Sequence, residues 1–176
     1  SYRRARCIAE NMPDVATFLD VGCNRGITSS YMLENGKAQR ATGIEFAREY
    51  VATRLLDNPR FSLMIGDVCN TAIPETYDVI FYGAVHHHVL RENGIAAAID
   101  ALKRLASNCG MHLFFETGHV TEGSRWKWQS EIRRFFKTDE EHIFFLLQQI
   151  EPYVDDFRIV GKFRIHGVRR WLIRID

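Results

Sequence analysis

The regular alternation of short apolar runs with helix-like segments is the feature that most constrains this chain. Five runs have the length and composition of buried strands: residues 16–22, 41–46, 61–68, 77–85 and 111–117. Segments with helical spacing lie in three of the four gaps between them: residues 28–36, 47–58 and 95–108. Because helical crossovers join successive parallel strands, this alternation predicts a largely parallel sheet covered by helices on both faces.

The alternation then ends, and the rest of the chain has a different pattern. Residues 118–154 indicate an insertion followed by a covering helix, with Thr138 as the N-cap and acidic residues in the first turn. Residues 157–165 and 168–175 alternate as strands do and are joined by a glycine-containing turn. We therefore expect a single α/β domain over residues 1–176. Its doubly wound, mostly parallel seven-stranded sheet would end in an antiparallel hairpin.

Composition narrows the class of protein. The 176 residues include 23 Lys and Arg against 22 Asp and Glu, and the net charge of +1 excludes a globally basic nucleic-acid binder. No apolar run reaches the roughly 20 residues of a membrane span, and the first residues lack the apolar core of a signal peptide. We therefore expect a cytoplasmic protein with no membrane span. Because the chain starts at Ser1 within a helix-like segment, we also expect it to be part of a longer, multidomain chain.

A glycine-rich turn follows the first predicted strand. In the segment Asp20–Gly26 (DVGCNRG), glycines let the backbone approach a ligand at the sheet edge where doubly wound folds bind ligands. Glu45 ends the second strand, where a carboxylate can bind both hydroxyls of a ribose. Asp67 ends the third strand, where a carboxylate can accept a hydrogen bond from an adenine amino group. These positions predict a nucleoside-binding crevice at the carboxyl ends of the strands.

Four strand-end motifs occur together: LDVGCNRG, GIEFA, IGDV and YDVIFYGAVHHHV, followed by a long helix and GMHLFFET. In order and spacing, the chain resembles the class I S-adenosylmethionine-dependent methyltransferases. The resemblance implies S-adenosylmethionine as the cofactor. The cofactor-binding residues that it implies are Asp20, Gly22, Asn24 and Gly26 at the amino-acid part, Glu45 at the ribose, Asp67 and Val68 at the adenine, and Gly83 beside the methionine portion. The family commonly has glycine where Asn24 stands, and asparagine tolerates the left-handed backbone such a turn needs.

A nicotinamide-binding domain is the alternative interpretation of the same alternation. It predicts a G-x-G-x-x-G turn and further parallel strands, whereas this chain has Gly22, Asn24 and Gly26 and a closing hairpin. Simple structural roles also stay open at this point. Asp20 can cap the following helix, and Gly22 can serve only to turn the chain.

The tract His86-His87-His88 follows the fourth predicted strand, at the level of the reactive sulfonium in the fold that the chain resembles. A neutral imidazole there can accept a proton from a hydroxyl during methyl transfer. We expect His87 to be this base, with His86 and Glu116 as further catalytic candidates. The alternative is that one histidine packs in the core and another lies on the surface.

Glu116 and His119, at the end of the fifth predicted strand, are expected to join His87 in a cluster that faces the substrate. Histidine and carboxylate side chains can also bind a divalent metal. Some O-methyltransferases of similar fold use a metal here, but their usual carboxylate after the fourth strand is replaced by histidine in this chain. The site is therefore predicted to hold no metal.

Two segments are candidates for binding the substrate that accepts the methyl group. The insertion mixes aromatic and cationic side chains that suit a sugar face, a nucleobase or an anionic group, unless they only form a surface helix: Arg125, Trp126, Lys127, Trp128, Arg133 and Arg134. The final hairpin carries a basic stripe that suits a phosphate-bearing substrate or RNA, unless it is only a solvated face: Arg158, Lys162, Arg164, Arg169, Arg170 and Arg174.

The motif that accompanies methylation of amide or base nitrogens, Asn or Asp followed by two prolines and an aromatic residue, is absent after the fourth strand. We therefore predict O-methylation of a hydroxyl on a sugar, glycan or small metabolite. One alternative is an RNA methyltransferase acting on ribose hydroxyls. The other is a module that binds the cofactor without turnover.

Overall fold

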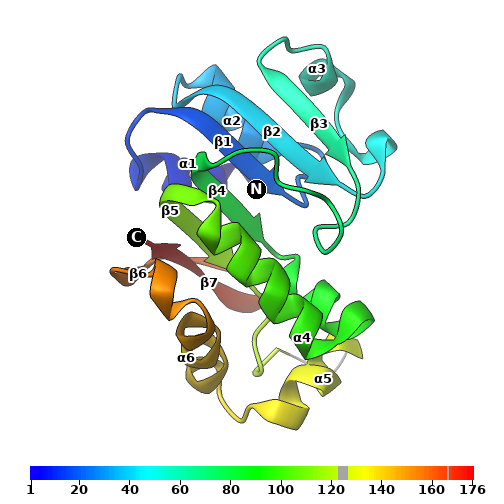
Figure 1. Cartoon of the computed structure of the whole chain (residues 1–176), viewed down its shortest axis with the longest axis vertical. Coiled ribbons are helices and arrows are strands. Elements are labelled where there is room, and N and C mark those ends of the chain that lie inside the picture. The colour runs from blue at the N-terminus through cyan, green and yellow to red at the C-terminus, as the bar shows by residue number, and fades with distance from the viewer. Residues whose placement is uncertain (123–126, 166) are drawn as a thin grey trace.

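Seven strands form one sheet in the order β3-β2-β1-β4-β5-β7-β6 (Figure 1). The computed structural model describes residues 1–122, 127–165 and 167–176. The strands are β1 (Val15–Val21), β2 (Ala38–Glu45), β3 (Phe61–Ile65), β4 (Tyr77–Gly83), β5 (Cys109–Glu116), β6 (Phe157–Ile165) and β7 (Val168–Ile175). β7 runs antiparallel to β5 and β6, and the other neighbouring strands pair in parallel. The predicted sheet, with its terminal antiparallel hairpin, is confirmed.

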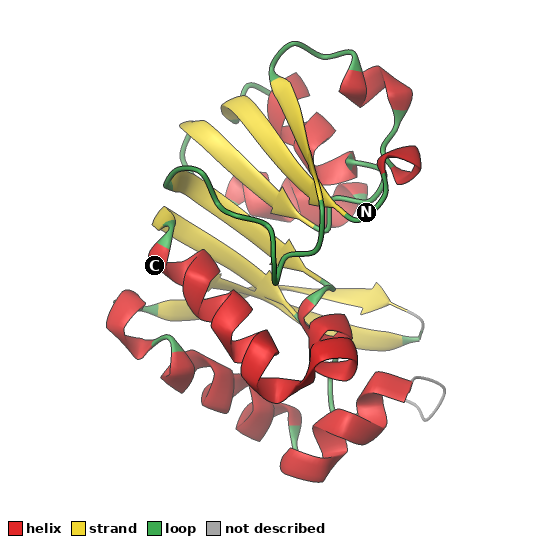
Figure 2. Ribbon diagram, turned by 45° about the vertical axis from the view of Figure 1, so that its right-hand side comes forward, coloured by secondary structure: helices red, strands yellow, loops and turns green. Residues whose placement is uncertain are grey.

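Helices cover both faces of the sheet (Figure 2). They are α1 (Tyr2–Glu10), α2 (Ile27–Glu34), α3 (Thr53–Leu56), α4 (His86–Ser107), α5 (Lys127–Phe135) and α6 (Asp139–Gln149), with 3-10 turns η1 (Arg48–Tyr50) and η2 (Glu151–Tyr153). Successive residues of a strand point to opposite faces. Phe18 of β1 therefore packs with Ile8 of α1 and Met32 of α2, whereas Leu19 packs in the cluster that includes Leu102 of α4. None of the helices within the described ranges is long and apolar enough to cross a bilayer.

The prediction of a single helix over residues 47–58 is wrong. The segment forms only η1 and the one-turn helix α3, with Val51 and Ala52 extended between them. Tyr50, Val51 and Thr53 are aromatic or β-branched residues of modest helix propensity. Val51, in the extended part, and Leu55, in α3, both pack into the core cluster that includes residues of α2.

The helix expected over residues 95–108 begins earlier, at His86. Gly94 has φ +85° and breaks the regular conformation, so α4 consists of a short segment, His86–Asn93, and a longer one beyond the kink. The histidine tract therefore forms the first turn of a helix that two residues separate from the end of β4.

The insertion contains a helix, α5, that the sequence pattern does not predict. Helix α6 follows α5. Thr138 caps α6 as predicted, because its hydroxyl accepts a hydrogen bond from the Glu141 N–H at 3.1 Å. α6 ends at Gln149 rather than at residue 154. Pro152 has no N–H to continue the helix, and the chain forms η2 instead.

Candidate functional site

A cavity of about 660 Å³ lies at the carboxyl ends of β1, β2 and β4. This volume falls within the roughly 300–1,000 Å³ range of small-molecule sites. The cavity wall includes most of the predicted cofactor-binding residues: Gly22, Asn24, Glu45, Asp67, Val68 and Gly83. The structure therefore brings together residues that lie far apart in the sequence, at the sheet edge where doubly wound folds bind ligands.

The turn after β1 depends on two left-handed residues. Gly22 has φ +69° and Asn24 has φ +49°. A side chain at Gly22 would run into Val85, so glycine is required both by the backbone angle and by the close approach of the next loop. Asn24 adopts the conformation that its tolerance of left-handed backbone predicts.

Glu45 is held in a fixed orientation at the end of β2. Its Oε2 accepts a hydrogen bond from the Asn24 N–H at 2.7 Å, and its Oε1 accepts one from the Phe46 N–H at 2.8 Å. The residue is 8% exposed and lines the cavity. A carboxylate oxygen has more than one lone pair, so both oxygens can still accept hydrogen bonds from a ligand.

Asp67 organises its own loop as well as lining the cavity. Its Oδ1 accepts a hydrogen bond from the Cys69 N–H at 2.7 Å, and its Oδ2 accepts one from the Asn70 amide at 3.4 Å. Val68, the next residue, packs in the core and also lines the cavity. The loop after β3 therefore presents both a carboxylate and an apolar side chain to the cavity.

Asp20 and Gly26, which are predicted to bind the cofactor, do not line the cavity. Asp20 is 2% exposed and accepts hydrogen bonds from the Ser29 N–H and hydroxyl, at 3.2 and 2.8 Å. Burial raises the pKa of Asp20 to about 6, against the lowering effect of the Ser29 hydroxyl. Asp20 thus ties β1 to the first turn of α2, which is the capping role left open by its position in the sequence. Gly26 is the N-cap residue of α2.

The histidine tract is divided between the core and the cavity. His86 is fully buried and lies edge-on to Tyr82 and Phe115, and burial lowers its pKa to about 3. His87 is 1% exposed, and its Nδ1 accepts a hydrogen bond from the Gly118 N–H at 3.0 Å. His88 is exposed and lines the cavity. The catalytic roles predicted for His86 and His87 stay predictions, and it is their neighbour His88 that the structure places on the cavity wall.

Glu116 is also buried away from the wall, and it pairs with a residue that sequence analysis missed. The Glu116 Oε1 accepts a hydrogen bond from the Arg4 Nη1 at 3.0 Å, and the guanidinium lies over the Phe81 ring at 5.0 Å. Arg4 lines the cavity. Nothing in its local sequence marks it, because it reaches the site from α1 only once the sheet has formed. Glu116 positions this cation, and its predicted catalytic role stays a prediction.

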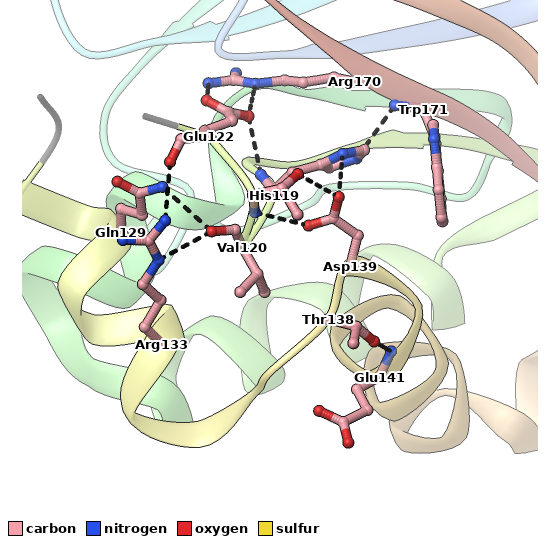
Figure 3. A network of polar contacts seen from close by, with 11 residues as sticks. His119, Val120, Glu122, Gln129, Arg133, Thr138, Asp139, Glu141, Arg170 and Trp171 are labelled. Atoms are coloured by element: carbon pink, nitrogen blue, oxygen red, sulfur yellow. Dashed lines mark hydrogen bonds and ion pairs between the residues drawn. The ribbon is translucent and has the colours of Figure 1, made fainter. Parts of the chain in front are cut away.

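His119 does not join Glu116 and His87 in the expected cluster. It belongs instead to a polar network beneath β7 (Figure 3), in which its Nδ1 lies 3.3 Å from the Asp139 Oδ2 and its Nε2 accepts a hydrogen bond from the Trp171 N–H at 3.2 Å. Although burial acts to raise it, hydrogen bonds from His119 and Thr121 lower the pKa of Asp139 to about 2. Within residues 1–122, 127–165 and 167–176, no three His, Cys, Asp or Glu side chains are arranged to hold a metal ion.

A buried ion pair completes this network. Arg170 of β7 donates two hydrogen bonds to Glu122, at 2.6 and 2.9 Å, and both side chains are almost fully buried. From α5, Gln129 and Arg133 each donate to the Val120 carbonyl oxygen, at 3.2 and 3.1 Å (Figure 3). The network fixes the start of the insertion, α5 and α6 against β7. Of the predicted acceptor residues in the insertion, Arg125 and Trp126 and the side chains of Lys127 and Trp128 lie outside the described residues.

Comparison with known proteins assigns the class. The sequence profile of a methyltransferase domain family matches residues 18–110, which is more than half of the chain. The chain therefore belongs to this methyltransferase domain family, and the predicted class I S-adenosylmethionine-dependent methyltransferase architecture is confirmed. No curated protein matches the chain significantly in sequence.

Solved structures with the same fold include several methyltransferases. The N-methyltransferase NodS from Bradyrhizobium japonicum WM9, in complex with S-adenosyl-L-homocysteine, is 15% identical, with a TM-score of 0.69 over 99% of this chain and 84% of that chain. The N-terminal domain of EvdMO1 with S-adenosylhomocysteine bound is 16% identical, with a TM-score of 0.67 over 99% and 79%. WbdD, solved with a kinase inhibitor, is 21% identical with a TM-score of 0.70, and this chain covers 99% of its own length but 38% of WbdD.

Proposed function

We propose that this chain uses S-adenosylmethionine to methylate a hydroxyl group of a sugar, a glycan or a small polar metabolite. The observation that carries the proposal is His88, an exposed imidazole on the wall of the cavity into which Glu45 and Asp67 face. A base beside the cofactor site aids methylation of oxygen more than that of better nucleophiles, because a hydroxyl must lose its proton as the new bond forms.

The cavity fits the cofactor by its chemistry. Ile44, Phe46 and Val68 supply apolar surface for an adenine ring beside the carboxylates of Glu45 and Asp67, and Phe46 is 75% exposed there. Arg4 supplies a cation suited to the carboxylate of an amino acid. Asp20, Gly22, Asn24, Gly26 and Gly83 shape the adjoining turns. The S-adenosylhomocysteine bound by NodS and by the EvdMO1 domain supports the same cofactor here.

His88 is suited to accept the hydroxyl proton. Partial burial and the nearby Arg91 and Arg170 lower its pKa below the ordinary histidine value, against the raising effect of Glu92. The imidazole is therefore neutral at pH 7 and has a free lone pair for the proton. Bound S-adenosylmethionine supplies the methyl group as an electrophile. The contribution of the chain is to hold the acceptor in line, exclude water and take up the proton at the ring of His88.

Charge pairing in the final hairpin supports an uncharged acceptor over RNA. Arg170 is paired with Glu122, and Arg174 is paired with Asp176 at 2.6 Å. Arg158 also lies 4.0 Å from the Asp176 carboxylate. Because Arg158 and Arg174 share the one Asp176 carboxylate, Glu122 and Asp176 neutralise two of the six cations of the predicted basic stripe, and the attraction of the stripe for a phosphate backbone is reduced accordingly.

The test is a methyl-transfer assay with labelled cofactor against saccharides, small hydroxyl compounds and RNA. We expect His88→Ala to lower kcat about 100-fold with a hydroxyl acceptor, the lower end of the usual range for loss of a general base. In the parent chain, kcat/KM should fall at acid pH as His88 becomes protonated, and this acid limb should disappear in the variant.

His112→Gln is the matched control, because His112 lies on β5 and pairs with Asp176 at 2.7 Å, away from the cavity wall. Unchanged turnover in His88→Ala would remove His88 as the base. Transfer only to a nitrogen or carbon acceptor would contradict the O-methylation proposal, and a failure to bind S-adenosylmethionine would contradict the cofactor.

A further inference from the structure

A second hollow, of about 490 Å³, adjoins the cavity. It is lined by Arg91 and Glu92 of α4 and by Ser130 and Glu131 of α5. Glu92 also lines the cavity that holds His88. The Glu92 side chain therefore borders both spaces.

The α5 wall of the hollow is held rigidly. Gln129, Ile132 and Arg133 form the inner side of the helix: Ile132 is fully buried, and the other two bond to the Val120 carbonyl oxygen. Helical geometry then directs Ser130 and Glu131 away from the core. The hollow is consequently bounded by a helix that the polar network of Figure 3 keeps in place.

The α4 wall is equally defined. His86 and His87 are buried and anchor the segment before the Gly94 kink, whereas His88, Arg91 and Glu92 are exposed. His88 and Glu92 are four residues apart and thus share one side of the helix. One continuous surface therefore carries the candidate base, at the cavity, and the polar side chains that lead away from it.

We propose that the hollow binds the units of an oligosaccharide acceptor that adjoin the methylated one, so that the substrate is a neutral glycan of at least two sugar units. This inference rests on the proposed function, because it assigns the surroundings of the same acceptor site. The reactive hydroxyl lies beside His88, and the following sugar lies between α4 and α5, against Arg91, Glu92 and Glu131.

The chemistry of the hollow suits an uncharged polyhydroxylated ligand. Carboxylates accept hydrogen bonds and a guanidinium donates them, while each sugar hydroxyl can do both. Arg91 is in contact with Glu92, and Arg134 is paired with Glu131 at 3.1 Å, so neither cation is left without a carboxylate. Among the described residues the charges of the wall are thus balanced, and no unpaired cation is left there to attract a phosphate backbone.

The experiment uses a glycan array graded from one to four sugar units, with neutral, carboxylated and phosphorylated members and a single-stranded RNA as a comparator. Methyl transfer from labelled S-adenosylmethionine gives kcat/KM for each compound. We expect a neutral di- or trisaccharide to exceed its own monosaccharide by about tenfold, the effect of one or two added hydrogen bonds. Ser130→Trp, which fills the hollow, should abolish this preference, and Glu131→Ala should reduce it.

Glu140→Gln is the control, since Glu140 is exposed in the first turn of α6 and lines neither space. Thermal shift with S-adenosylhomocysteine verifies that each variant folds and binds the cofactor product. Equal kcat/KM for mono- and oligosaccharides, or a length preference untouched by Ser130→Trp, overturns the extended site while leaving O-methylation standing. Preference for phosphorylated glycans or RNA also overturns it. If no hydroxyl is methylated, the proposed function fails, and binding of the S-adenosylhomocysteine-loaded protein to the same array still tests the length preference.

Discussion

Glu45 shows how single residues prepare the site, because two backbone N–H groups hold its carboxylate before any ligand arrives. Preorganisation of this kind reduces the entropy lost on binding. The same principle applies to Arg4, which Glu116 and the Phe81 ring hold at the cavity. Both side chains are fixed by contacts that sequence spacing alone does not show.

Replacing Glu45 tests its predicted bond to the cofactor ribose. We expect Glu45→Ala to weaken S-adenosylmethionine binding by about 2 kcal/mol, or roughly 30-fold, the scale for loss of hydrogen bonds to a charged group. Isothermal titration calorimetry measures the change. Glu49→Ala is the control, because Glu49 is an exposed carboxylate in η1 that does not line the cavity. An affinity equal to that of the parent chain would remove Glu45 from the binding site.

At the scale of elements, the insertion is attached to the sheet by a buried ion pair rather than by apolar packing alone. Removing one partner of such a pair leaves an uncompensated charge in the core, which typically costs about 3–5 kcal/mol. We therefore expect Glu122→Gln to lower the free energy of unfolding by this amount, as measured by urea denaturation.

A surface pair provides the control for this prediction. Arg40 and Glu75 are 2.6 Å apart, but their side chains are 54% and 35% exposed. Exposed pairs contribute about 0–1 kcal/mol, so Glu75→Gln should have little effect. Replacing both Glu122 and Arg170 with apolar residues of similar size should recover much of the lost stability. Equal losses from Glu122→Gln and Glu75→Gln would show that the buried pair does not hold the insertion.

At the scale of the whole molecule, the sheet could be predicted because each strand carries its own apolar pattern and turn signals. The cofactor crevice could be predicted because parallel strands place their carboxyl ends at one edge. What could not be predicted depends on tertiary contacts. His88 rather than His87 lines the cavity because the histidine tract forms the first turn of α4, and Arg4 reaches Glu116 only through the packing of α1.

Burial of uncharged histidines makes the stability of the whole fold depend on pH. Burial lowers the pKa of His86 to about 3 and that of His142 to about 4, and neither ring has a hydrogen-bond partner among the described residues. His142 stacks on Phe136 with ring centroids 4.9 Å apart, on the same side of the sheet as His86. Both imidazoles act as apolar rings and must stay neutral for the folded state to persist.

The direction of this pH dependence follows from the difference between the histidine pKa values of the unfolded and folded states. In the unfolded chain a histidine binds a proton near pH 6.5, whereas in the folded chain these two do so only near pH 3–4, so the unfolded state gains protons first as pH falls. Stability should therefore decrease between pH 6.5 and 4, by about 1.4 kcal/mol per pH unit for each histidine. Urea denaturation across this range measures the slope. Replacing both His86 and His142 with phenylalanine should reduce this slope by the equivalent of up to two protons. The contribution of His87 would remain, because burial also lowers the pKa of His87. An unchanged slope would show that protonation of His86 and His142 does not drive acid unfolding.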